Sequence, residues 1–89
     1  MNNTDFLPIG SVCTIKNEQN NVMIAGFAIK LAGKIYDYIG VIHPIGMIDK
    51  LQCKYFNKED VVEVLFKGYE TDKHPQFITE LKNYINKDK

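Results

Sequence analysis

Two cysteines and two histidines are the residues in this 89-residue chain best suited to nucleophilic catalysis or metal binding. A reactive cysteine needs a histidine or carboxylate within hydrogen-bond reach and surroundings that favour its thiolate. Cys13 and Cys53 instead lie in β-rich stretches, and His43 and His74 each precede a proline in a predicted turn. The four residues are too scattered for a zinc site, whose ligands usually come in close pairs. We therefore expect free structural thiols, solvated histidines, and no bound metal or cofactor.

Asp37 is the most unusual acidic residue, because it lies among isoleucine, tyrosine and valine residues. A carboxylate in such a place must be hydrogen-bonded or paired. We expect it to accept a hydrogen bond from a backbone amide or a tyrosine hydroxyl and so fix a nearby turn. Partner recognition and acid–base chemistry are the alternatives. Glu59 and Asp60 are interpreted as part of a turn or a short helical start, so no residue pattern predicts an enzyme.

The charges of the chain balance, with eleven lysines against eleven acidic residues and no arginine. Nucleic-acid binding draws its affinity from excess positive charge, and arginine is the preferred side chain for phosphate and guanine. Charge therefore argues against a nucleic-acid partner. The composition, 45% hydrophobic and 25% charged, is typical of a folded globular domain.

The expected location is the cytoplasm, with no membrane association. Residues 1–7 lack the charged and apolar regions of a secretory signal peptide. The longest apolar run, residues 22–29, is too short to span a bilayer. Two cysteines without other covalent staples also suit a reducing compartment. Export by a route that reads no N-terminal signal is the exception that this reasoning leaves open.

Alternating and β-branched segments predict an α+β domain over residues 1–89, with a loose lead-in at 1–6 and a β-sheet region at 7–69. We expect a small antiparallel sheet or partly open barrel of four to five strands. The strands are predicted at 11–16, 22–31, 35–42, 51–56 and 61–69. The last also fits a short helix, although its β-branched residues favour a strand. Gly26 should mark a bulge or a close approach.

The C-terminal region, residues 72–87, has the spacing of an amphipathic helix that packs on the sheet. Pro75 suits its first turn. The apolar residues recur at helical spacing and would form one face from 75 to 87: Phe77, Ile78, Leu81, Tyr84 and Ile85.

Tyr36, Tyr38, Ile45 and Met47 are the residues that we expect to contact a partner. Tyrosines are enriched at protein interfaces, although they can equally cover a thin core. Ile45 and Met47 fall in a Pro/Gly turn, which should lie at the surface. Apolar side chains there need a cover, either the C-terminal helix or another protein.

Several segments, read together, resemble a known family. They are LPIGSV at 7–12, YDYIGV at 36–41, P-x-G at 44–46, FN-x-x-D at 56–60 and V-x-F-x-GY at 64–69. The chain resembles a family of small proteins of formerly unassigned function from low-GC Gram-positive bacteria. The resemblance covers residues 7–69. Val61 stands where isoleucine is usual, and Ile45 where glutamate is common.

The resemblance implies a function, because genes of this family typically neighbour type VII secretion genes and LXG-type toxin genes. It implies a protein-binding accessory factor or targeting chaperone for a secreted toxin. The family has no catalytic residues that could be assigned to positions of this chain. The alternative from the residues is a small β-barrel module that binds nucleic acid. The two hypotheses predict different partners, a protein encoded nearby or a DNA or RNA strand.

Overall fold

The computed structural model describes residues 6–48 and 52–87 of the chain. In this part, five strands form one antiparallel sheet in the order β4-β3-β2-β1-β5. A 3-10 turn, η2 (Lys58–Asp60), joins the last two strands, and α1 (His74–Lys87) follows the sheet. The strands are β1 (Val12–Ile15), β2 (Val22–Leu31), β3 (Lys34–Ile42), β4 (Lys54–Phe56) and β5 (Val61–Phe66).

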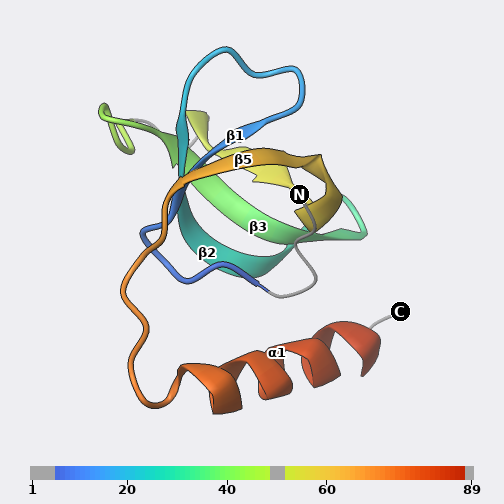
Figure 1. Cartoon of the computed structure of the whole chain (residues 1–89). Coiled ribbons are helices and arrows are strands. Elements are labelled where there is room, and N and C mark those ends of the chain that lie inside the picture. The colour runs from blue at the N-terminus through green and yellow to red at the C-terminus, as the bar shows by residue number, and fades with distance from the viewer. Residues whose placement is uncertain (1–5, 49–51, 88–89) are drawn as a thin grey trace.

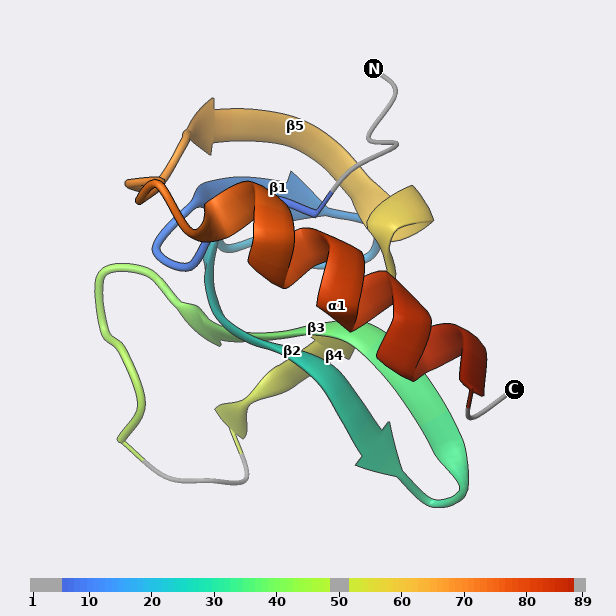
Figure 2. The ribbon, with the colours of Figure 1, turned by 90° about the horizontal axis from the view of Figure 1, so that it is seen from below.

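The sheet is strongly curved and α1 lies across its open side (Figures 1 and 2). This confirms the predicted α+β class, an antiparallel sheet packed by one C-terminal helix. Within the described residues, no helix has the length and apolar character needed to cross a membrane.

The β2–β3 hairpin is the longest pairing of the sheet, and its turn follows from two residues. Ala32 and Gly33 both adopt positive φ, at 53° and 80°. Leu31 pairs directly with Lys34 across them, so the loop has two residues, a length that matches the twist of the strands. Further along β2, the register shifts between Ile24 and Gly26. The predicted bulge at Gly26 is therefore confirmed.

The core fills the concave side of the sheet. Tyr38, Ile24, Val22 and Cys13 are fully buried there. Phe6 is also buried, at 4% exposure, and its ring lies 5.8 Å from that of Phe27. The prediction of a loose lead-in through residue 6 is therefore wrong at Phe6, whose aromatic ring joins the core; residues 1–5 lie outside the described residues.

Helix α1 closes the core through one face. Ile78, Leu81 and Ile85 are buried and belong to the same apolar cluster as Phe6 and Tyr38. Their spacing of three and four residues places them on one side of the helix. Phe77, at the edge of this face, lies 5.5 Å from the ring of Phe27. The predicted helix is thus confirmed, and it begins at His74, within the predicted region 72–87.

The ends of two strands differ from the predicted bounds. The fourth strand begins at Lys54 rather than at Leu51, which lies outside the described residues. The fifth ends at Phe66 rather than at Tyr69. The reason lies at Gly68, whose N–H donates to the Ser11 hydroxyl at 2.9 Å and whose Cα approaches the Ile9 carbonyl too closely for a side chain. The Gly68 N–H thus bonds a side-chain hydroxyl rather than a strand carbonyl, so the backbone ladder of β5 does not continue at this residue.

Candidate functional site

Tyr36 and Tyr38, which the sequence places two residues apart on one strand, lie on opposite faces of the sheet. Tyr38 is fully buried, and its ring lies 5.2 Å from Phe56 in the core. Tyr36 instead lies 6.0 Å from Tyr55, the strand neighbour of Phe56 that points the other way. A partner cannot reach Tyr38, so the prediction that Tyr38 binds one is wrong.

The change of faces between Tyr36 and Tyr38 falls opposite a kink in β2. Ala28 has a φ of 53°, and it falls opposite Asp37, between the pairs Phe27–Tyr38 and Ile29–Tyr36. Positive φ is uncommon for a residue with a side chain, and it breaks the regular alternation of the strand. The expectation that residues two apart on a strand share one face of the sheet therefore does not hold for Tyr36 and Tyr38.

Asp37 has the structural role that we expected. Its carboxylate accepts the backbone N–H of Lys58 at 2.9 Å, and its own N–H donates to the side-chain oxygen of Asn57 at 3.0 Å. The carboxylate of Asp60 in turn accepts the N–H of Asn57 at 2.9 Å. The first two bonds hold η2 against β3, and the third closes the turn itself. Asp37 therefore fixes a turn that is adjacent in space, 21 residues along the chain, through a backbone amide rather than through a tyrosine hydroxyl.

The loop after β3 carries the other two predicted site residues. The N–H of His43 donates to the Asn21 carbonyl, and that of Gly46 to the Ile42 carbonyl, so the loop is anchored at its base. Ile45 and Met47 are 60% and 59% exposed. Helix α1 therefore does not cover them, which was the alternative expectation. Their contact with a partner stays a prediction.

A groove of about 420 Å³ lies beside the base of this loop. Its walls come from the start of β1, the start of β2 and the end of β5. The lining residues are Gly10, Val12, Asn21, Met23, His43, Leu65 and Phe66. None of them is a lysine, aspartate or glutamate, so the groove is suited to apolar groups.

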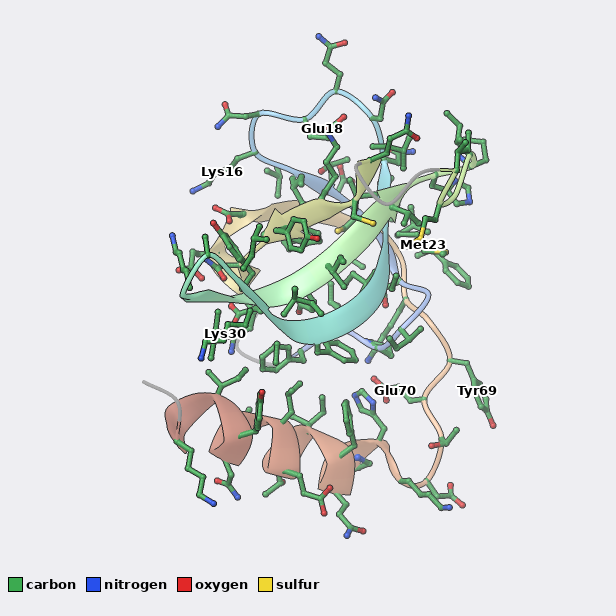
Figure 3. All side chains as sticks on the ribbon, turned by 180° about the vertical axis from the view of Figure 1, so that it is seen from behind. Lys16, Glu18, Met23, Lys30, Tyr69 and Glu70 are labelled. Carbon is green, nitrogen blue, oxygen red and sulfur yellow. The ribbon has the colours of Figure 1, made fainter. Side chains whose placement is uncertain are left out.

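Three segments converge around the groove. The turn before β1, the loop after β3 and the segment after β5 lie on the same side of the molecule in both views (Figures 1 and 2). Met23 and Tyr69 also lie on one side in the view from behind (Figure 3). We call this surface the apolar end and define it by six exposed residues: Ile9, Ile45, Met47, Leu65, Phe66 and Tyr69.

Sequence reasoning found two of these six residues and missed the others. Phe66, the last residue of β5, is 61% exposed, and Tyr69, which the predicted strand 61–69 included, lies beyond β5 and is 85% exposed. Ile9 is half exposed because the chain turns at Gly10. Two features of the sequence could have indicated these exposed positions. Pro8 and Gly10 are typical of a turn around Ile9, and Gly68 is typical of a strand end before Tyr69.

A second hollow of about 420 Å³ lies between α1, η2 and β3. Lysines and carboxylates both line it, including Asp37, Lys58, Glu59 and Lys82. One of these carboxylates already has a partner within the fold, since Asp37 accepts from the Lys58 backbone N–H. The Lys58 ammonium lies 4.6 Å from the Phe6 ring centre. We therefore interpret this hollow as part of the packing interface between the helix and the sheet rather than as a binding site.

The two thiols are free, as expected. Burial raises the pKa of Cys13 to about 11, so at neutral pH it is a protonated apolar side chain rather than a nucleophile. In the described part of the chain, no three histidine, cysteine, aspartate or glutamate side chains gather where a metal ion could be held.

Comparison with known proteins gives a family. Residues 6–77 match the model of a domain of unknown function, DUF4176. The chain belongs to the DUF4176 family. The DUF4176 match spans the whole sheet and the first residues of α1, and ends just before Ile78. No curated protein and no solved structure matches the chain significantly.

Proposed function

We propose that this DUF4176 protein is a protein-binding accessory factor whose partner docks on the apolar end. The observation that supports the proposal is that six exposed apolar residues lie on segments at one end of the molecule. Two of them, Leu65 and Phe66, line a groove that has no lysine, aspartate or glutamate in its walls. Water-exposed apolar surface is costly when it is contiguous, and in small folded proteins such surface commonly marks a docking site. Interface centres are likewise depleted of charge and enriched in aromatic residues and methionine.

We further propose that the partner is an LXG-type toxin exported by a type VII secretion system. The protein would act in the cytoplasm as its accessory or targeting chaperone. This part rests on the resemblance carried by the segments LPIGSV, YDYIGV and V-x-F-x-GY. Those segments contain part of the proposed docking surface, including Ile9, Phe66 and Tyr69.

The proposal is tested by co-expressing the protein with the LXG-type toxin encoded beside it and purifying one through a tag on the other. The double variant Ile45→Asp with Met47→Asp adds two charges to an exposed loop without touching the core. We expect it to fold normally and to lose the toxin. Leu31→Asp is the matched control, because Leu31 is 44% exposed and ends β2 at the β2–β3 turn. This turn lies on the other side of the molecule from the apolar end (Figure 1).

Two outcomes contradict the proposal. Full recovery of the toxin by the folded double variant would place the docking site elsewhere. Loss of the toxin in Leu31→Asp alone would move it to the β2–β3 turn. Circular dichroism of each variant separates lost binding from lost folding.

The alternative function, a nucleic-acid-binding module, is favoured by one arrangement on the convex face. Tyr36 and Tyr55 lie beside each other there, with their ring centres 6.0 Å apart. The Lys34 ammonium lies 5.1 Å from the Tyr36 ring centre. Aromatic rings flanked by lysines can stack nucleotide bases. The zero net charge argues against this function, and an electrophoretic shift of DNA or RNA at low salt would favour it.

A further inference from the structure

The apolar end is large enough to hold a partner of the same chain. Its six defining residues are between 46% and 85% exposed. Together they present on the order of 700 Å², taking about 200 Å² for each large side chain. This is within the roughly 600–1,000 Å² that each partner buries in a standard protein interface. A second copy that covered this surface would therefore make an interface of ordinary size.

The charges at the rim are self-complementary. Lys67 and Glu70 flank Tyr69 and pair with each other at 3.2 Å, with side chains 63% and 38% exposed. An exposed pair of this kind contributes little to stability. In a two-fold arrangement each residue meets its counterparts on the other copy, so Lys67 of one copy can pair with Glu70 of the other at small cost.

Long-range repulsion does not oppose this association. The formal net charge of the chain is zero, and proteins near zero net charge associate more readily than strongly charged ones. The groove itself contributes Asn21 and His43 as its only polar side chains. Both are polar without being acidic or permanently charged, so two facing grooves bring no like charges together.

The edge of β5 is a less suitable place for a second copy. Ile15 pairs with Val61 while Thr14 pairs with Glu63, and Cys13 pairs with Val64 while Val12 pairs with Phe66. The strand therefore carries one extra residue at Val62 and another at Leu65. Bulges twist an edge strand and interrupt the ladder that a new strand would have to join. Association through side chains of the apolar end is favoured over strand addition.

We propose that two copies of the chain cover each other's apolar end in a two-fold dimer when no toxin is bound. A toxin must then displace the second copy, a step that rests on the proposed function. The dimer would keep the apolar surface out of water until the client arrives. Client binding and dimerisation exclude each other, because both use the same residues.

Sedimentation equilibrium of the full chain over about 1–100 µM tests the dimer, a range that covers micromolar dissociation constants. We expect a reversible monomer–dimer equilibrium that Phe66→Asp weakens at least about tenfold. Met47→Asp should weaken the dimer too. Because Met47 lies in an exposed loop, this variant serves as a control in case Phe66→Asp disturbs the folding of β5. Leu31→Asp should leave it unchanged. A monomer at every concentration would overturn the proposal, and so would a dimer that neither Phe66→Asp nor Met47→Asp weakens.

Adding the toxin separates this inference from the proposed function. A one-to-one complex that forms as the dimer disappears supports both. A toxin complex that contains two copies of the chain overturns mutual exclusion. A dimer that binds no toxin supports the dimer proposal and contradicts the proposed function. A protein that stays monomeric and binds toxin supports the proposed function and contradicts the dimer proposal.

Discussion

The hydroxyl oxygen of Tyr38 accepts a hydrogen bond from the backbone N–H of Leu7 at 2.8 Å, inside the core. This bond joins the segment before β1 to the middle of β3, 31 residues along the chain. It satisfies a buried amide that faces no strand partner. Through it the turn that carries Ile9 is held at the apolar end, so a core tyrosine positions one wall of the proposed docking surface.

Replacing Tyr38 by phenylalanine should therefore destabilise the protein. The substitution leaves the Leu7 N–H buried without its acceptor, which typically costs about 1–3 kcal/mol. Tyr36→Phe is the matched control on the convex face, and we expect it to stay within about 0.5 kcal/mol of the wild type. Urea unfolding followed by circular dichroism measures both, and equal stabilities of the two variants would contradict the role given to the Tyr38 hydroxyl.

Leu81 should matter more than any exposed residue of α1. Leu81→Ala removes a buried side chain and should cost about 2–4 kcal/mol, a large part of the total for a domain of this size. Tyr84→Ala, on an exposed position of the same helix, should change stability by less than about 1 kcal/mol. Leu81→Asp should abolish cooperative thermal unfolding, because it buries an unpaired charge. A near-native melting temperature of Leu81→Asp would show that the helix does not dock as described.

Gly40 should not tolerate alanine. A Cβ at this position would lie 2.5 Å from Cγ1 of Val22 and 2.9 Å from the Met23 carbonyl oxygen. The backbone oxygen cannot move aside as a side chain can, so we expect a cost of at least about 2 kcal/mol. Gly26→Ala meets only the end of the Ile39 side chain and should cost less than about 1 kcal/mol. Thermal unfolding compares the two, and the reverse order of stabilities would contradict this packing.

The two thiols should differ in reactivity. With a pKa of about 11, Cys13 is ionised to about one part in a thousand at pH 8, and its side chain is also fully buried. Cys53 is partly exposed. Mass spectrometry after iodoacetamide treatment should show one adduct, at Cys53, in the folded protein and two in urea. Modification of Cys13 at the same rate as Cys53 without denaturant would contradict the buried position of β1.

Much of the fold followed from local patterns. The apolar spacing of Ile78, Leu81 and Ile85 specifies a helix with one buried face, and Gly26 marks the bulge of β2 correctly. Asp37 was expected to fix a turn because a half-buried carboxylate needs donors, and it does. These predictions depend on neighbours within a few residues, where the sequence is most informative.

The candidate site was less predictable, because it depends on contacts between distant segments. Tyr36 and Tyr38 face opposite sides of the sheet where Ala28 of the paired strand has a positive φ, a conformation that an alanine in the sequence does not predict. The contact of Gly68 with Ser11 and Ile9 spans more than fifty residues, so the sequence around Tyr69 does not reveal that β5 ends before it. Ile45 and Met47 were found because a Pro/Gly turn signals exposure locally.

Site-specific photo-crosslinking tests most directly the central claim that a protein partner docks on the apolar end. A benzophenone amino acid is introduced in place of Ile45, Phe66, Leu31 or Tyr84, one at a time, and each protein is irradiated with the LXG-type toxin proposed as its partner. Crosslinks to the toxin from positions 45 and 66, with none from 31 or 84, are the predicted result. Crosslinks only from position 31 or 84 would contradict the claim, because they would place the partner on the β2–β3 turn or on the outer face of α1.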